Sequence, residues 1–177
     1  NINLPSVESE ISAYWDKINA FETSVENRKN DKTFRFYDGP PFPTGSPHYG
    51  NLLAGVIKDI VPRYWTMRGY YVERRFGWDV HGLPIEMEVQ KKLNLEDPQQ
   101  IDEYGIDKFN EACRSQVQTN TENWEKITRK IGRWVDFEND YKTMDIEFME
   151  SVWWVFKELW SKDLIYQDYK VLPYSWA

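Results

Sequence analysis

Apolar residues recur at three- and four-residue spacing along several stretches of the chain, which is the pattern of helices with one buried side. Residues 6–28 carry the pattern first, and we expect a single amphipathic helix there. The pattern returns from about His48 to Arg68, where Pro62 is expected to bend or break the helix and Gly69 to end it. Further helices are predicted over about residues 84–93, 107–132 and 145–162.

Two aromatic stretches, residues 33–38 and 70–76, are predicted strands. Each is followed by a glycine-containing loop and then by a helix. This order is typical of a parallel α/β sheet, in which ligands bind beyond the carboxyl ends of the strands. The two loops are therefore expected to lie side by side at a ligand site. Residues 164–177 are expected to form one or two further short strands.

Composition narrows the class of protein. The 177 residues amount to about one domain of roughly 150 residues, and 41% apolar with 29% charged residues excludes a disordered chain. No apolar run approaches the roughly 18 residues of a membrane span, and the N-terminus lacks the basic-then-apolar pattern of a signal peptide. A single cysteine, Cys113, excludes a disulfide framework and a cysteine zinc cluster within the chain. We therefore expect a cytoplasmic protein without membrane contact.

Charge and aromatic content add two further expectations. The net charge of −7 argues against a dedicated nucleic-acid-binding domain. One basic concentration fits either a solvated face or a local RNA-binding strip, and it consists of Lys58, Arg63, Arg68, Arg74 and Arg75. Aromatic residues make up 16% of the chain, which suggests large buried contacts to further parts of a bigger protein or to a flat ligand.

The first loop, residues 39–51, contains four prolines and three glycines and is expected to be ordered. It lacks the spacing of a Walker loop and of GxGxxG. His48 and Asn51 stand three apart at the start of the predicted helix, so they share a face beside free N–H groups that suit a phosphate. Gly50 between them would let a flat ring lie against the backbone. The alternative is a capped helix with a surface histidine, which this loop taken alone favours.

The second loop, GWDVHGLP, places Asp79 and His81 two residues apart, where both could face a common cleft. A carboxylate at a strand end suits an amine, although an Asx-type turn is the plainer interpretation. A three-ligand metal site from His48, Asp79 and His81 is disfavoured, because no further ligand recurs at a metal-binding spacing. No metal site is assigned. The hypothesis of a serine hydrolase with Ser46 as nucleophile is even less favoured, because the proline after this serine is incompatible with the G-x-S-x-G turn.

These two loops resemble known signatures. The first is similar to the HIGH signature of class I aminoacyl-tRNA synthetases, present here as His48-Tyr49-Gly50-Asn51 after a D-G-P-P-x-x-x-G lead-in. The second, GWDVHGLPIE, resembles the isoleucine branch of that family. The similarity continues through KDIVPRYWTMRGYYVERR and FNEACRSQV to KVLPYS, so it covers nearly the whole chain. Two loops with the correct order, spacing and flanks make the resemblance specific.

The resemblance implies a Rossmann-like catalytic domain that activates L-isoleucine with ATP and Mg²⁺ and transfers it to tRNA(Ile). His48 and Asn51 would be the catalytic groups and hold the phosphates, with Gly50 facing the adenine. The implied ATP site consists of Pro41, Thr44, His48, Gly50 and Asn51. The implied amino-acid site consists of Gly39, Pro40, Asp79 and His81, with Asp79 on the ammonium group. Asn51 replaces the second histidine of the family pattern, and it can donate a hydrogen bond but never carry a positive charge.

The resemblance also implies boundaries. Residues 1–32 would form an N-terminal helical extension, and residues 33–177 the first half of the catalytic domain, ending near the start of an editing insertion. The lysine-rich KMSKS loop of the family is not in this chain. We expect a fragment that needs the remainder of the same polypeptide and is inactive alone. Any zinc of the enzyme would lie in that remainder and none in this chain. The alternative is a non-catalytic nucleotide- or RNA-binding module.

Overall fold

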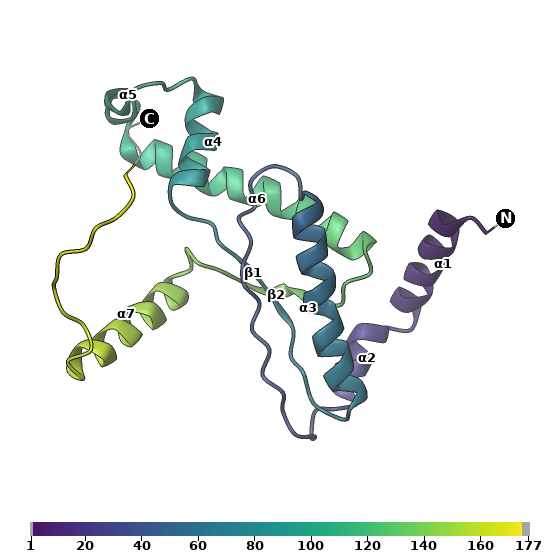
Figure 1. Cartoon of the computed structure of the whole chain (residues 1–177). Coiled ribbons are helices and arrows are strands. Elements are labelled where there is room, and N and C mark those ends of the chain that lie inside the picture. Colours follow the sequence, from purple (N-terminus) through teal and green to yellow (C-terminus); the bar gives the residue numbers. More distant parts are fainter. Residues whose placement is uncertain (1, 175–177) are drawn as a thin grey trace. The chain divides into compact units, whose positions relative to one another are not determined.

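The computed structural model describes residues 2–174, apart from the side chain of Gln118, and contains helices and a small parallel sheet (Figure 1). Its elements in chain order are α1 (Leu4–Lys17), α2 (Ala20–Glu26), α3 (Tyr49–Met67), β1 (Arg75–Trp78), α4 (Leu83–Leu93), α5 (Pro98–Tyr104), α6 (Ile106–Lys130), β2 (Asp136–Lys142) and α7 (Ile146–Ser161). The chain divides into two compact units, one ending at Thr143 and the other beginning at Met144.

The sheet is parallel, as predicted. Strand β1 pairs with β2, with Arg75 opposite Asp136 and an irregularity before Gly77. A further extended segment joins through an isolated parallel bridge between Thr33 and Tyr71, where the Phe34 N–H donates to the Tyr71 carbonyl at 2.9 Å. Three extended segments therefore run in the same direction, and the α/β class with a Rossmann-like parallel arrangement is confirmed.

The strand boundaries differ from those predicted. In the predicted strand 33–38 only Thr33 makes a bridge, and β1 begins at Arg75 rather than at residue 70. Strand β2 was not predicted, because DFENDYK lacks alternating apolar residues and becomes a strand by pairing with β1. The strands predicted after residue 163 are wrong for residues 164–174, which have no pairing partner there, and residues 175–177 lie outside the described part.

Two helix predictions also need correction. The single helix expected over 6–28 is two helices, because Asn19 adopts a left-handed conformation with φ of 45°, which asparagine tolerates. Pro62 does not break α3; its ring is buried, and its carbonyl accepts hydrogen bonds from Thr66 Oγ1 (2.9 Å) and Arg74 Nη2 (3.2 Å). Gly69, with φ of 90°, follows the end of α3 as predicted.

The other long helices match their predicted bounds within one or two residues. Helix α4 was predicted from Pro84 at a first-turn position, α6 as a polar helix with few apolar residues, and α7 from its amphipathic pattern. The short helix α5 was missed in the stretch broken by Pro98 and Gly105. Asp97 caps it by accepting a 2.8 Å hydrogen bond from the Gln99 N–H, so Pro98 starts a helix here.

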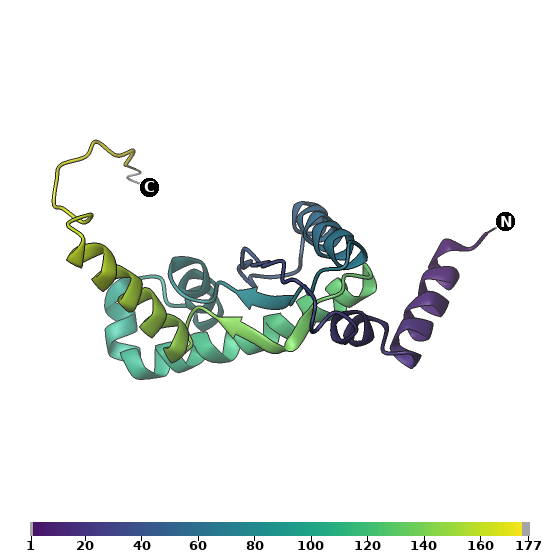
Figure 2. The same cartoon turned by 90° about the horizontal axis from the view of Figure 1, so that it is seen from below.

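One face of the sheet is covered by α3 and α6. Alternate residues point to the same face of a strand, and Val72, Arg74, Phe76 and Trp78 are all buried. The Trp78 ring lies edge-on to Trp124 of α6 at 6.3 Å, while Arg74 bonds to α3. Figure 2 shows α6 running along the strand pair. Part of the core of this unit therefore lies between the sheet and these two helices. A further part involves α4 and α6, whose buried residues include Ile85, Val89, Phe109 and Val117.

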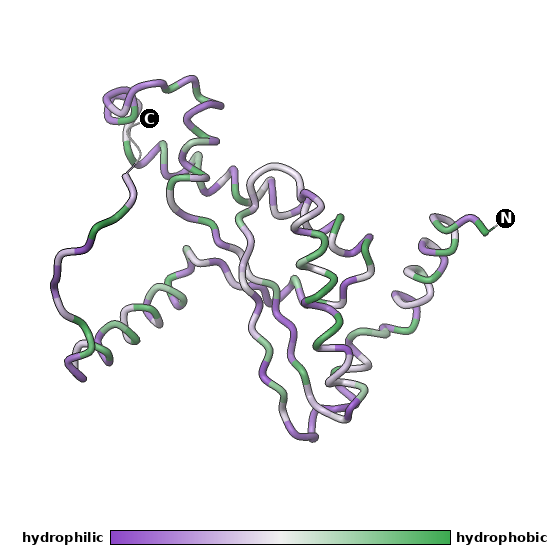
Figure 3. Tube along the Cα trace, in the orientation of Figure 1, coloured by the Kyte–Doolittle hydropathy of each residue, from purple (hydrophilic) through white to green (hydrophobic). Residues whose placement is uncertain are grey.

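Much of α3 is hydrophobic (Figure 3), and many of its apolar residues are exposed. Only Gly55 and Pro62 are buried in this helix. The exposed apolar residues follow helical spacing and include Leu53, Val56, Ile57, Ile60, Tyr64 and Met67. Surface hydrophobic residues are usually scattered singly, whereas a continuous apolar stripe of this kind is typical of a helix face that contacts another protein segment.

Helix α1 is held to its unit by a cation between two indole rings. The Trp15 and Trp134 rings lie 5.2 Å apart in an edge-to-face arrangement. The Arg63 guanidinium carbon lies 5.3 Å from the first ring centroid and 3.8 Å from the second. Because α1 buries no residue of its own, this contact is an important part of its attachment.

Candidate active site

The two loops singled out by sequence are joined by a hydrogen bond. The Asp79 N–H, directly after β1, donates to the Pro41 carbonyl at 2.9 Å. Pro41 itself follows the first extended segment. The carboxyl ends of neighbouring parallel strands meet at one edge of a sheet, so the expected side-by-side placement of the loops is confirmed.

Thr143 completes this edge and was missed by the sequence analysis. It follows β2, and its N–H donates to the Trp78 carbonyl at 3.0 Å. Its hydroxyl oxygen accepts a 3.0 Å hydrogen bond from the Val80 N–H and donates at 3.4 Å to Asp79 Oδ1. The Asp79 side chain is only half-buried, so its carboxylate is oriented yet accessible to a ligand. No local signal marks Thr143, because β2 itself was not predictable.

His48 is the N-cap of α3. Its Nδ1 accepts a 3.1 Å hydrogen bond from the Gly50 N–H, and its own N–H donates at 3.0 Å to Asn51 Oδ1. This is a reciprocal capping box, so the capped helix proposed as the plainer alternative is present. Because Nδ1 is an acceptor, the neutral ring carries its proton on Nε2. The His48 side chain is exposed, and Nε2 makes no hydrogen bond within residues 2–174.

Fewer backbone donors face outward at the start of α3 than a bare helix end offers. The Asn51 and Leu52 N–H groups donate to the His48 carbonyl at 2.9 and 3.2 Å, and the Gly50 N–H is taken by the histidine ring. A Cβ at residue 50 would lie 2.9 Å from His48 Cε1, so glycine is needed for the ring to close over the helix start. Side-chain donors and the helix dipole are therefore the main attraction for an anion here.

Helix α6 fixes the middle of the first loop. Trp124 Nε1 donates to the Gly45 carbonyl at 2.9 Å, and Asn123 Nδ2 donates to Ser46 Oγ at 3.2 Å. Thr44 is half-buried beside them. These contacts agree with the expectation that the proline-rich loop is ordered.

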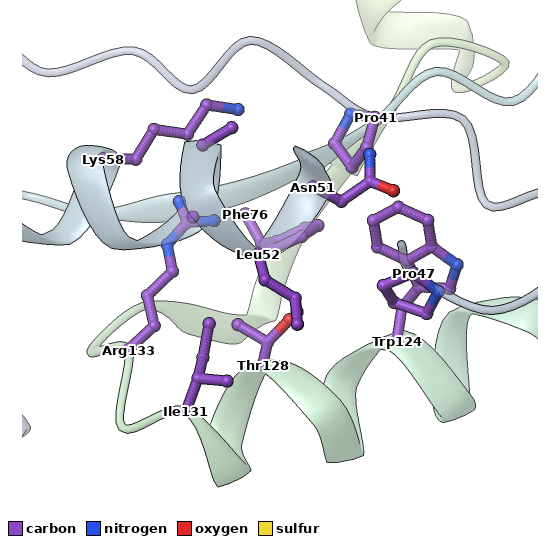
Figure 4. A pocket seen from close by; sticks show the side chains of 12 residues that line it. Pro41, Pro47, Asn51, Leu52, Lys58, Phe76, Trp124, Thr128, Ile131 and Arg133 are labelled. Atoms are coloured by element: carbon purple, nitrogen blue, oxygen red, sulfur yellow. The ribbon is translucent and has the colours of Figure 1, made fainter. Parts of the chain in front are cut away.

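A cavity of about 50 Å³ lies between α3, β1 and α6 (Figure 4). Pro41 and Asn51 line one part of it and Lys58 and Arg133 another. Ligand pockets usually measure roughly 300–1,000 Å³, so this cavity has room for a few water molecules and not for a nucleotide. A ligand held by His48, Asn51 and Asp79 must therefore bind outside it, over the exposed strand ends.

The remaining predicted site residues are less closely tied to this edge. The Gly39 carbonyl accepts a 2.6 Å hydrogen bond from Lys58 Nζ, and Pro40 is half-buried. His81 is exposed, and neither His81 nor Thr44 makes a side-chain hydrogen bond within the described residues. Among residues 2–174 no three histidine, cysteine, aspartate or glutamate side chains gather as ligands of a metal ion.

The basic concentration noted in the sequence is largely internal. Arg74 is 2% exposed, and burial lowers the pKa of its guanidinium to about 10. Arg63 is held between two indole rings and by Asp59 at 2.6 Å, while Lys58 is paired with Asp38. These three cations serve contacts within the fold, whereas Arg68 and Arg75 are exposed. The five residues therefore do not all lie on one solvated surface.

The family model of class I tRNA synthetases (I, L, M and V) matches residues 10–177. The chain belongs to this family. It is 54% identical, over 98% of its length, to the cytoplasmic isoleucine–tRNA ligase of Arabidopsis thaliana and to the isoleucine–tRNA ligase of Mycobacterium tuberculosis (strain ATCC 25618 / H37Rv). With the isoleucine–tRNA ligase of Anaplasma marginale (strain St. Maries) it shares 55% identity over its full length. It spans only 14%, 17% and 16% of these three relatives.

The fold of this class I chain is also found in a solved structure. The LeuRS–tRNA–LeuAMS ternary complex from Agrobacterium radiobacter K84 superposes with a TM-score of 0.61 at 23% identity, over 91% of this chain and 18% of that one. The likeness supports the parallel-sheet architecture described above. No helix within residues 2–174 is both long and apolar enough to cross a membrane.

Proposed function

We propose that this chain is part of an isoleucine–tRNA ligase, in which it supplies one half of the site that forms isoleucyl-adenylate and then transfers isoleucine to tRNA(Ile). Curated relatives with that name are 54–55% identical to it. Because the chain spans at most 17% of these three, the activity belongs to a longer cytoplasmic protein. Residues 1–32 are its N-terminal extension, and residues 33–177 are the first half of its catalytic domain.

The single observation that carries the proposal is the convergence of three strand ends on one carboxylate. Asp79 is anchored through its backbone by Pro41 and oriented through its side chain by Thr143. A fixed, accessible carboxylate is the group that an amino acid's ammonium requires. Gly39, Pro40 and His81 complete the surroundings of the amino acid in this proposal, with Gly39 and Pro40 beside its side chain.

ATP binds beside the start of α3 in this proposal. His48 Nε2–H and the Asn51 amide donate to the phosphates, and the positive end of α3 adds to the attraction. Gly50 faces the adenine in this proposal, with Pro41 and Thr44 beside it. Mg²⁺ enters with the nucleotide as part of the substrate, and the described residues hold no metal cluster of their own. Any zinc of the enzyme belongs to the rest of the polypeptide.

The chemical step is attack of the isoleucine carboxylate oxygen on the α-phosphorus of ATP. A new P–O bond forms, and the bond to the leaving pyrophosphate breaks. The chain's own contribution is to hold the two reactants in line, with Asp79 on one and His48 and Asn51 on the other. Donors that meet the developing phosphate charge stabilise the transition state.

Isoleucine-dependent exchange of pyrophosphate into ATP by the full-length protein tests the proposal. Isoleucine should be the preferred substrate and valine a measurable second, because one methylene is worth only about 1–3 kcal/mol in an apolar pocket. Residues 1–177 alone should not turn over. Preference for leucine, or exchange independent of any amino acid, would contradict the assignment.

A further inference from the structure

Asp38, the last residue before the proline-rich loop, is a buried carboxylate held by two cations. Its side chain is fully buried, with Oδ2 2.7 Å from Arg133 Nη2 and Oδ1 2.7 Å from Lys58 Nζ. Its carbonyl accepts a 2.7 Å hydrogen bond from the Tyr141 hydroxyl. Burial raises the pKa of Tyr141, so the phenol stays protonated and remains a donor.

The two cations do different things. Arg133 is 6% exposed and makes a well-directed hydrogen bond to the carboxylate. Lys58 is 28% exposed, pairs with Oδ1 by charge, and directs its hydrogen bond to the Gly39 carbonyl at 2.6 Å. Lys58 belongs to α3, whereas Gly39 opens the loop that reaches Asp79. One side chain thus connects the helix of the proposed ATP site to the loop of the proposed amino-acid site.

The consequence for the loop follows from geometry. The cluster fixes Asp38 and Gly39 from three sides, and Pro41, two residues on, holds the Asp79 N–H at 2.9 Å. Proline at residues 40 and 41 restricts the backbone between them, so a shift at Gly39 is passed to Pro41. Catalysis by positioning is sensitive to displacements of about 1 Å.

We propose that Lys58, paired with Asp38, is a positioning residue. It fixes the position of Asp79, the carboxylate that binds the substrate's ammonium group, relative to the start of α3. The role rests on the proposed function and adds to it a group that touches neither substrate. It acts through the Gly39 and Pro41 carbonyls. A purely structural ion pair would instead stabilise the unit without tuning either substrate.

Lys58→Met tests this in the full-length protein. Asp38→Ala is a less informative variant, because it leaves two cations without their carboxylate partner and can prevent folding. Lys58→Met keeps the aliphatic part of the side chain and leaves Asp38 paired with Arg133. The concentration of active sites is measured by the burst of adenylate. The KM for isoleucine should rise by about 10-fold or more, which is the effect expected from loss of a hydrogen bond to a charged group. The KM for ATP should change by less than about 3-fold. Lys58→Arg should restore most of the isoleucine KM.

Arg63→Met is the matched structural control. It breaks an ion pair in the same helix, with Asp59 at 2.6 Å, and a 2.6 Å hydrogen bond to the Gly132 carbonyl. Neither of these contacts involves residues 39–51. The variant should lower the active fraction while both KM values stay unchanged. The Lys58→Met effect should also shrink in an Asp79→Asn background, since coupled residues are not additive. Equal changes in both KM values, or unchanged constants, would overturn the positioning role.

Hydrogen exchange separates this proposal from the proposed function. Lys58→Met should speed exchange of the Asp79 amide, read in peptides covering residues 77–82, while α6 peptides stay as in the wild type. Unchanged exchange at residues 77–82 overturns the positioning role, whatever the enzyme's activity. Faster exchange in Lys58→Met, together with no isoleucine-dependent turnover by the wild-type protein, would keep the coupling and reject the synthetase assignment.

Discussion

Asp79 and Pro41 are joined by a single backbone hydrogen bond of 2.9 Å, which brings the two candidate loops to one edge of the sheet. The bond uses the amide of Asp79 and leaves its carboxylate for Thr143 and a ligand. Because the backbone amide makes this bond, the position of the residue is fixed while its carboxylate oxygens remain available as acceptors.

Asp79→Asn keeps the shape and removes the charge. Isoleucine binding should weaken by roughly 10- to 150-fold, because a hydrogen bond to a charged group contributes about 1.5–3 kcal/mol. ATP binding should change much less. Equilibrium binding of each substrate to the full-length protein measures both effects. Normal isoleucine affinity would show that Asp79 is only a turn residue.

His48 combines two roles that a pair of substitutions can separate. Asparagine is a good N-cap, so His48→Asn should keep the start of α3, whereas His48→Ala should loosen it by about 1 kcal/mol. Both should lower kcat by about 10²–10³, since both remove a preorganised donor to the phosphates. Pyrophosphate exchange gives kcat, and hydrogen exchange over residues 49–55 reports the cap. A wild-type kcat in His48→Asn would show that the histidine only caps the helix and does not act as a donor to the phosphates.

Asn51→His would restore the family pattern. We expect an active enzyme, because an imidazole nitrogen can also accept the His48 N–H. Both nitrogens of an imidazolium are donors, so the new ring gains positive charge only by giving up this acceptor. As pH drops through the ordinary histidine pKa of about 6.5, the KM for ATP should fall while the helix cap weakens. The comparison is the ATP KM of variant and wild type across that pH range. An inactive variant would mean that residue 51 has no space for a ring.

Gly77 marks a close approach within the sheet. A Cβ at this residue would collide with the Tyr141 ring, so Gly77→Ala should displace the ring and destabilise the unit by about 1–3 kcal/mol. Gly55→Ala is the control; its Cβ would meet Ile131 Cδ1 at an ordinary 3.5 Å, and alanine favours the helix. Hydrogen exchange of β1 and β2 peptides should separate the two variants. Equal protection in both would refute the predicted collision.

Cys113 should be a slow thiol. It is half-buried, and burial raises its pKa, with Glu86 contributing further. A raised pKa means less thiolate at neutral pH, so iodoacetamide should react more slowly with Cys113 than with the free thiol of glutathione. The rate of labelling should increase as pH increases. Glu86→Gln should speed labelling, as followed by mass spectrometry of the Cys113 peptide. Labelling faster than glutathione would contradict the stated environment.

Local patterns in the chain were enough for much of the description. Apolar periodicity located α3 and α7, Pro84 indicated the start of α4, and Gly69 marked the end of α3. The two loops were recognisable because their residue types and spacing carry chemistry without any partner. The order of strand, loop and helix predicted a parallel sheet, and that order placed the loops together. All of these are properties of contiguous sequence.

The tertiary structure decided the rest, because those features depend on residues distant in the chain. Strand β2 exists through its pairing with β1, and Thr143 reaches Asp79 only through that pairing. Asp38 is an unremarkable aspartate in sequence and becomes a buried centre only where α3 supplies Lys58 and the segment before β2 supplies Arg133. Sequence spacing specifies which groups are available, whereas burial and ion pairing are set by contacts that form only when the chain folds.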